Sequence, residues 1–178
     1  MEKKKETRKD VREKLKKIYG WEKDYYGKKI LSLLEAEKIF QEAKNILLFW
    51  SLPDEIPTHD FIIKWSKEKN IYLPVVIGDD SEIRPFTTPD KMKTGAFNIA
   101  EPIGERISNY ESIDLIIVPG MAFDLDGNRI GRGKGYYDKL LKHFSCPKIA
   151  ICFSCQIYPS VPHDEWDQKV DKIITYYT

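Results

Sequence analysis

Short apolar segments alternate with helical patterns along most of this chain, and that alternation limits its possible folds more than any other feature. The apolar segments have the length of strands and lie at residues 45–50, 71–77, 113–119, 148–153 and 170–176. Apolar residues recur at helical spacing within residues 3–18, 28–44, 60–70 and 136–144. Strands that are apolar on both faces and alternate with helices predict an α/β fold, with a doubly wound, mostly parallel sheet and helices on both faces.

Three segments carry more detailed information. Val11, Leu15 and Ile18 form the narrow apolar stripe of a helix that docks on one side, and the other faces of that helix are mostly basic. Thr58 is the predicted N-cap of the helix within 60–70. Residues 78–111 contain clusters of Gly, Pro and Thr around short strand-like pieces, so we predict no arrangement for them.

The length and charge of the chain suit one small domain. With 178 residues, 42% of them hydrophobic, we expect a single α/β domain over 1–178. The 29 basic and 28 acidic residues give a net charge of +1, which predicts no general affinity for nucleic acid or membranes. No apolar run approaches the roughly 18 to 20 residues of a membrane span, and residues 1–10 lack the apolar core of a signal peptide. We therefore expect a cytoplasmic monomer that acts on small molecules.

The three cysteines are expected to be free thiols, because an odd number without an export signal argues against a disulfide framework. A zinc site is the alternative, since His143, Cys146, Cys152 and Cys155 lie close together in the sequence. Cys152 closes a predicted strand, however, and that strand would separate the two candidate pairs of ligands.

A loop rich in glycine and cations joins the strand at 113–119 to the helix at 136–144. Its glycines, which permit positive φ and a close backbone approach to a ligand, are Gly127, Gly131, Gly133 and Gly135. Its cations are Arg129, Arg132 and Lys134. Backbone N–H groups with charged side chains predict an anion site, most simply for a polyphosphate. The spacing matches neither a Walker A motif nor a dinucleotide-binding loop, so a flexible, solvated turn is the alternative.

The helix that follows this loop has a core face and one acidic residue away from that face. Tyr137, Leu140, Leu141 and Phe144 form the apolar stripe, whereas Tyr136 should turn toward the cleft. Asp138 lies off the stripe, where it could either complement the helix dipole or hold Mg2+ against bound phosphates. The neighbouring cations favour the magnesium role.

Residues 118–141, "VPGMAFDLDGNRIGRGKGYYDKLL", closely resemble the signature of the 5-formyltetrahydrofolate cyclo-ligase family. Further segments resemble that family in the same order, namely "KKETR" at 4–8, "FWSLPDEI" at 49–56, "FNIAEP" at 97–102 and "VPHDEWDQKVDKIIT" at 161–175. The resemblance implies an ATP- and Mg2+-dependent enzyme that converts 5-formyltetrahydrofolate into 5,10-methenyltetrahydrofolate, ADP and phosphate.

The resemblance also implies roles for individual residues. ATP would be bound by Lys4, Lys5, Arg8, Arg129, Gly131, Arg132, Gly133, Lys134, Gly135, Tyr136 and Tyr137. The folate would be bound by Arg8, Trp50, Glu55, Arg132, Gly133 and Tyr136. Arg8, Arg132 and Lys134 would act in catalysis, and Asp138 and Asp167 would bind Mg2+.

Other interpretations of the same residues remain open. Lys4 and Arg8 could form a solvated helix face, Trp50 could belong to the core, and Glu55 or Asp167 could be ordinary loop acids. A sugar-phosphate isomerase or an acyl-CoA transferase would use the glycine loop for a substrate phosphate. It would then need a base or a covalent carboxylate, such as Glu55 or Glu101. A non-catalytic reduced-folate-binding protein is the remaining alternative.

Overall fold

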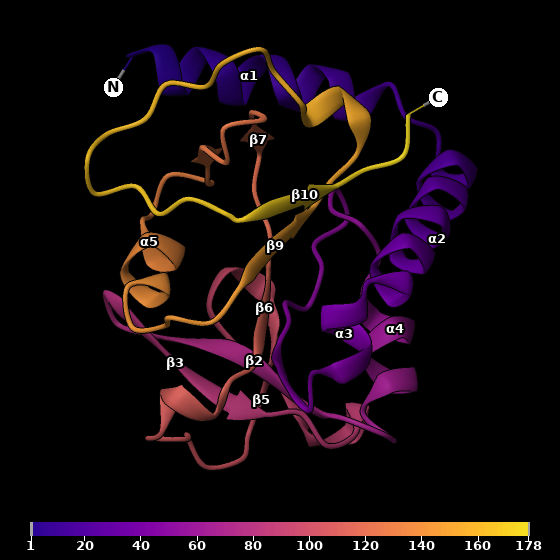
Figure 1. The fold of residues 1–178 in the computed structure, drawn as a ribbon. Coiled ribbons are helices and arrows are strands. Elements are labelled where there is room, and N and C mark those ends of the chain that lie inside the picture. Colours follow the sequence, from indigo (N-terminus) through magenta and orange to yellow (C-terminus); the bar gives the residue numbers. More distant parts are fainter. Residues whose placement is uncertain (1, 178) are drawn as a thin grey trace.

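A computed structural model describes residues 2–177, and its centre is a six-stranded sheet (Figure 1). The strand order is β10-β9-β6-β1-β2-β3, and every neighbouring pair is parallel except β2 and β3. The bounds are β1 Asn45–Leu47, β2 Asn70–Ile77, β3 Asp80–Pro85, β6 Leu115–Val118, β9 Lys148–Ile151 and β10 Lys172–Ile174. The predicted α/β fold with a mostly parallel sheet is confirmed.

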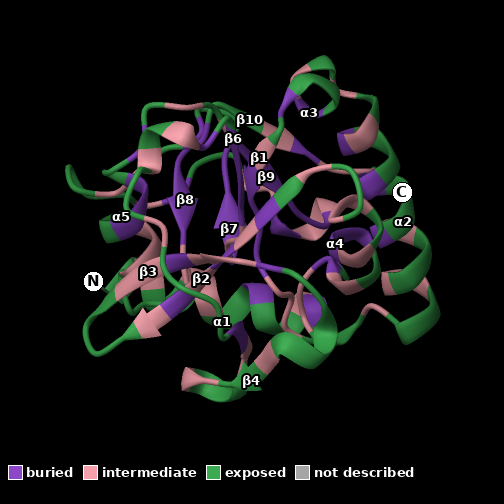
Figure 2. Ribbon diagram, turned by 90° about the horizontal axis from the view of Figure 1, so that it is seen from below, coloured by how far each residue is buried: buried purple, intermediate pink, exposed green. Residues whose placement is uncertain are grey.

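Alternate residues of the central strands enter two different apolar clusters, so the sheet is covered on both faces (Figure 2). In β1, Ile46 packs in the first cluster and Leu47 in the second. The first cluster receives side chains from α1 Glu2–Lys16, α2 Gly20–Ala36, α3 Lys38–Glu42 and α4 His59–Trp65. The second receives Leu140 and Leu141 from α5 Tyr136–Leu141. The first helix docks through Val11 and Leu15, as its stripe predicts.

Two local predictions differ from the structure, the second of them only in part. Residues 28–44 belong to two helices, because Glu37 takes an extended backbone (φ −67°, ψ 127°) between α2 and α3. Thr58 is the N-cap residue of α4, as predicted, but its side chain forms no capping hydrogen bond to the helix. Instead its Oγ1 donates to Phe49 O at 2.6 Å and accepts from Ser51 N at 3.0 Å. Thr58 therefore joins the start of α4 to the loop after β1, and this contact fixes the backbone that carries Trp50.

The segment without a predicted arrangement, together with the glycine loop, forms two small hairpins beside the main sheet. One contains β4 Met92–Thr94 and β5 Ala100–Pro102, and the other contains β7 Ala122–Phe123 and β8 Arg129–Ile130. Short 3-10 helices lie at Pro89–Lys91, Ala96–Asn98, Tyr110–Ser112 and Ser154–Gln156. No helix of residues 2–177 combines the length and apolar character that a membrane crossing requires.

The cysteines are free thiols, and Cys152 is buried in the second apolar cluster. Burial raises the pKa of the Cys152 thiol. Within residues 2–177 no group of three or more His, Cys, Asp or Glu side chains is arranged to hold a metal ion.

Asp124 anchors the turn that leads into the glycine loop. It is 1% exposed, and its Oδ1 accepts from Asp126 N at 3.1 Å and Asn128 N at 3.0 Å. Its Oδ2 accepts from Asn128 Nδ2 at 3.0 Å and from Val161 N at 2.9 Å. Burial would raise the pKa of this carboxyl, but these hydrogen bonds outweigh it and hold the pKa below its ordinary value of 3.8.

Asp124→Asn should therefore lower the free energy of unfolding at pH 7 by about 1–3 kcal/mol, because an amide cannot accept all four hydrogen bonds. A carboxyl whose pKa is depressed in the folded state contributes stability above its unfolded pKa. That contribution disappears as the pH falls through the folded pKa. Urea unfolding at several pH values should thus show the difference between variant and wild type shrinking below the ordinary pKa of 3.8. A difference that stays constant with pH would contradict this role.

Candidate active site

A cavity of about 770 Å³ opens beyond the carboxyl ends of β1 and β6. This is the edge at which parallel α/β sheets bind ligands. Its lining includes nearly all of the predicted site residues: Lys4, Arg8, Trp50, Glu55, Arg129, Gly131, Arg132, Gly133, Lys134, Gly135, Tyr136, Tyr137, Asp138 and Asp167. Lys5 is exposed on α1 and is not part of the lining. The structure thus brings distant segments of the chain together, as the predicted site requires, with Lys5 as the exception.

Three of the four glycines in the loop have the positive φ that an anion-binding loop needs. Gly127, Gly133 and Gly135 have φ of +81°, +109° and +73°, a region that favours glycine. Gly131 does not have a positive φ, so that prediction is wrong at this residue. A Cβ there would lie 2.9 Å from Arg129 Nη1, so glycine at position 131 instead allows the arginine to approach closely.

Arg8 links the N-terminal helix to the glycine loop. Its Nε donates to Gly131 O at 2.7 Å, and its guanidinium carbon lies 3.5 Å from where a Cβ on Gly133 would be. Burial, together with the charge of Arg12, lowers the pKa of Arg8, but an arginine remains charged at neutral pH. Arg8 forms no ion pair with any residue from 2 to 177, so its charge faces the cavity without a carboxylate partner.

Lys4 joins the same helix to the loop near the C-terminus. Its Nζ forms ion pairs with Asp164 at 2.5 Å and with Asp167. Burial would lower the pKa of Lys4, but the hydrogen bonds to these two carboxylates outweigh that effect and raise it. Asp167, a predicted magnesium ligand, is therefore held at the cavity by a lysine.

Arg132 crosses to the loop after β1. Its Nη2 lies 2.6 Å from Asp54 Oδ1 and 3.1 Å from Glu55 Oε1, and Glu55 Oε2 accepts from Leu52 N at 2.8 Å. Burial raises the pKa of Glu55, although Leu52 N and Arg132 act in the opposite direction. Glu55, which is predicted to bind the folate, and Arg132, which is predicted to bind phosphate, are thus in direct contact.

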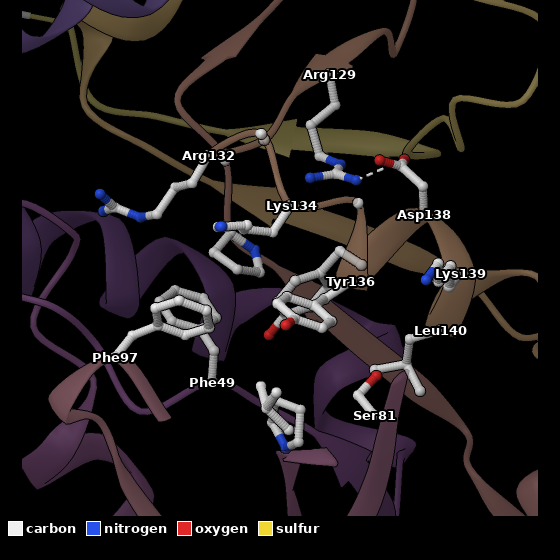
Figure 3. A pocket seen from close by; sticks show the side chains of 18 of the residues that line it. Phe49, Ser81, Phe97, Arg129, Arg132, Lys134, Tyr136, Asp138, Lys139 and Leu140 are labelled. Atoms are coloured by element: carbon white, nitrogen blue, oxygen red, sulfur yellow. Dashed lines mark hydrogen bonds and ion pairs between the residues drawn. The ribbon is translucent and has the colours of Figure 1, made fainter. Parts of the chain in front are cut away.

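Arg129 and Asp138 form the most enclosed ion pair of the site (Figure 3). Arg129 Nη2 lies 2.7 Å from Asp138 Oδ1, and the same oxygen accepts from Gln168 N at 3.0 Å. The Arg129 side chain is only 2% exposed. Asp138 therefore has a structural role, the neutralisation of a buried guanidinium, besides any contact with a ligand.

Asp138→Asn should lower the free energy of unfolding by about 3 kcal/mol, because it leaves the Arg129 charge buried without a partner. Chemical denaturation of the variant beside wild type measures this effect. Asp126→Asn is the matched control, since Asp126 is exposed and forms no ion pair with the described residues. Equal stability of Asp138→Asn and wild type would show that the ion pair contributes nothing.

Aromatic side chains form the other wall of the cavity. Trp50 stacks on His59 with ring centroids 4.0 Å apart and lies 5.8 Å from Phe86. Tyr136 lies 5.9 Å from Phe97 and donates its hydroxyl hydrogen to Gly78 O at 3.2 Å. This wall offers flat apolar surfaces to an aromatic ligand.

Tyr137 packs inward from the start of α5. Its ring packs against both apolar clusters, as its position in the helical stripe predicts. Its hydroxyl is buried and has no hydrogen-bond partner among residues 2–177, and burial raises its pKa.

The lining also contains residues to which the main sequence interpretation assigns no role, among them Ser81, Phe97 and Glu101. Phe97 has a φ of +57°, and Asn98 beside it has +62°, so the tip of the β4–β5 hairpin is a tight turn. Phe97 is the first residue of "FNIAEP", and the resemblance of that segment to the family is the one sequence feature that points to this position. Nothing in the local sequence indicates Ser81.

A mostly parallel α/β sheet with a glycine-and-cation loop and an aromatic wall at one cavity is typical of enzymes that bind small molecules beyond the carboxyl ends of the strands. The model of the 5-formyltetrahydrofolate cyclo-ligase family matches residues 1–176, and this chain belongs to that family. The predicted family is therefore confirmed.

Individual relatives agree with this assignment. The chain is 34% identical to the 5-formyltetrahydrofolate cyclo-ligase of Mus musculus, covering 80% of this chain and 81% of that protein. It is 32% identical to the Haemophilus influenzae protein of the same name, covering 81% and 80%. The solved structure of Aquifex aeolicus 5,10-methenyltetrahydrofolate synthetase has a TM-score of 0.88 and 37% identity, covering 97% of this chain and 89% of that one.

Proposed function

We propose that this chain converts 5-formyltetrahydrofolate and ATP into 5,10-methenyltetrahydrofolate, ADP and phosphate, with Mg2+ as cofactor. The observation that carries the proposal is the composition of the cavity. Arg8 and Lys134 bring positive charge without carboxylate partners among residues 2–177, and Trp50 and Phe97 line the same space with aromatic rings. The cations can bind the triphosphate of ATP, and the aromatic rings can stack on the flat rings of a folate.

The reaction needs activation of a poor electrophile. The formyl oxygen attacks the γ-phosphorus of ATP, and the bond from that phosphorus to the bridging oxygen of ADP breaks. N10 of the folate then attacks the formyl carbon, its proton is lost, and the carbon–oxygen bond breaks to release phosphate. Such a sequence requires alignment and charge neutralisation more than a side-chain nucleophile.

The residues of the cavity have corresponding roles in this proposal. Arg8 and Lys134 would neutralise the charge that develops on the transferring phosphoryl group. The N–H groups of the glycine loop would orient the phosphates, and the aromatic wall would hold the folate and keep water from the activated carbon. Arg132 would connect both halves through Glu55.

The residues present fit a magnesium ion. Asp138 and Asp167 both line the cavity and offer hard carboxylate oxygens, and Mg2+ in nucleotide sites commonly takes one or two carboxylates together with phosphate oxygens and water. Bound there, the ion would neutralise phosphate charge. Arg129 and Lys4 would keep the two carboxylates oriented toward it.

The rival functions make a different prediction about ATP. A sugar-phosphate isomerase, an acyl-CoA transferase or a folate-binding protein would form no methenyl product from 5-formyltetrahydrofolate and ATP. The test follows methenyl absorbance with purified protein and the folate, with Mg-ATP present or omitted. Product that requires Mg-ATP supports the proposal, whereas folate binding without turnover favours the binding protein.

A further inference from the structure

The carboxylate of Glu101 has no role in the proposed reaction, although it lines the cavity. Glu101 is the middle residue of β5 and is 4% exposed. Its Oε1 accepts from Val76 N at 3.1 Å, and it forms no ion pair with a residue between 2 and 177. A buried charge with a single donor is costly, and the carboxylate keeps unused acceptor positions. This arrangement calls for further N–H or O–H donors.

Gly95 fixes the place of this carboxylate from the other side. A Cβ on Gly95 would overlap Glu101 Oε2. The backbone of Gly95 is extended (φ −108°, ψ −152°), a conformation that other residues also adopt, so no turn requires glycine here. The close approach of the carboxylate explains the glycine. Glu101 is thus held between Val76 and Gly95 at the wall of the cavity.

A second polar group lies on β3, the strand next to β2. Ser81 Oγ is buried, belongs to the lining, and has no hydrogen-bond partner in the described part of the chain (Figure 3). Ser81 is paired with Val76 across β2 and β3, so the hydroxyl and the carboxylate both adjoin Val76. The surrounding lining is apolar, with Leu73, Pro74 and Ile99. Few polar groups in an apolar wall are typical of a site that orients a heterocycle.

We propose that Glu101 recognises the amino-substituted pyrimidine edge of the folate, with Ser81 as its hydrogen-bonding companion. This inference rests on the proposed function. The edge presents an exocyclic amine beside a ring N–H, and two parallel N–H donors match the two oxygens of a carboxylate. The same carboxylate repels a phosphate. Glu101 therefore directs the heterocycle to the β2–β5 side and leaves the glycine loop to ATP.

Calorimetry on wild type and Glu101→Gln, with 5-formyltetrahydrofolate and with its analogue that carries a methyl group in place of the 2-amino group, tests this role. Wild type should bind the natural folate about 10- to 100-fold more tightly than the analogue. Glu101→Gln should lose most of that preference by binding the natural folate more weakly. Its affinity for ATP should stay within about twofold of wild type, since only the folate contact is changed. Glu82→Gln is the control, because Glu82 pairs with Arg84 outside the lining.

Gly95→Ala provides a second variant that keeps the charge. Its methyl group must displace the Glu101 carboxylate, so it should also lose the preference for the amine, and thermal unfolding verifies that each variant is folded. If both variants keep the wild-type preference, Glu101 only caps Val76 and the inference is overturned. If wild type makes methenyl product but does not distinguish the two ligands, this inference fails alone. If wild type makes no product with ATP, the proposed function fails.

Discussion

Arg8→Ala should lower turnover by about two to three orders of magnitude, while the free energy of unfolding changes little. Arg8 reaches the glycine loop from α1 and has no carboxylate partner among residues 2–177, so its charge is free to stabilise the phosphoryl group in transit. The only hydrogen bond of its side chain within residues 2–177 is to Gly131 O. The helix itself docks through Val11 and Leu15, which the substitution does not touch.

Steady-state kinetics at saturating ATP and folate, beside thermal unfolding, measure this effect. Arg12→Ala is the matched control, since Arg12 is exposed on the same helix and does not line the cavity. Removal of residues 1–9 should reduce turnover at least as much, because Lys4 is lost together with Arg8. If the truncated chain kept near-wild-type turnover, the assignment of α1 to the active site would be wrong.

Lys134→Ala should weaken ATP binding by about 10- to 100-fold without unfolding the protein. Lys134 is exposed, lines the cavity and makes no ion pair with residues 2–177. Its Nζ lies 5.9 Å from the centre of the Phe97 ring. It is therefore placed where the phosphate half of the cavity meets the aromatic half, and its charge is not already neutralised.

Calorimetric titration with ATP tests this prediction, with Lys38→Ala as a control on the exposed pair with Glu42. Arg132→Ala, which the sequence pairs with Lys134, should behave differently. Its removal leaves Glu55 buried without a cation, so folate affinity should also fall. Unchanged ATP binding in Lys134→Ala would contradict a phosphate-binding loop.

The fold followed from the sequence because its signal is spread over whole segments. Strands such as 113–119 are apolar on successive residues, and only a sheet covered on both faces accommodates that pattern. The failures were local. Glu37 interrupts a continuous helical pattern, and Thr58 turns its hydroxyl back to the loop after β1 instead of forming a capping hydrogen bond with α4. Single contacts of this kind depend on neighbours that are remote in sequence.

The candidate site was predictable where chemistry is concentrated in one stretch. The residues of the glycine loop are adjacent in the sequence, so their common role could be predicted from the sequence itself. Arg8 is remote in the sequence, and only the resemblance to a family placed it beside the loop. The partners of the charged groups were not predictable. Asp138 forms an ion pair with Arg129 and accepts a hydrogen bond from Gln168 N, and Asp167 forms an ion pair with Lys4. These contacts arise because the loop near the C-terminus folds back over α1 and α5. Glu101 reaches Val76, which is paired with Ser81, only when the β4–β5 hairpin packs on β2.

The most direct test of the account is the fate of the formyl oxygen. 5-Formyltetrahydrofolate labelled with oxygen-18 in its formyl group would be converted with unlabelled ATP in a single turnover, and the released phosphate would be analysed by mass spectrometry. If the formyl oxygen attacks the γ-phosphorus in this cavity, each phosphate should carry one labelled oxygen and the ADP none. Unlabelled phosphate formed in step with methenyl product would show that ATP hydrolysis does not pass through the formyl oxygen.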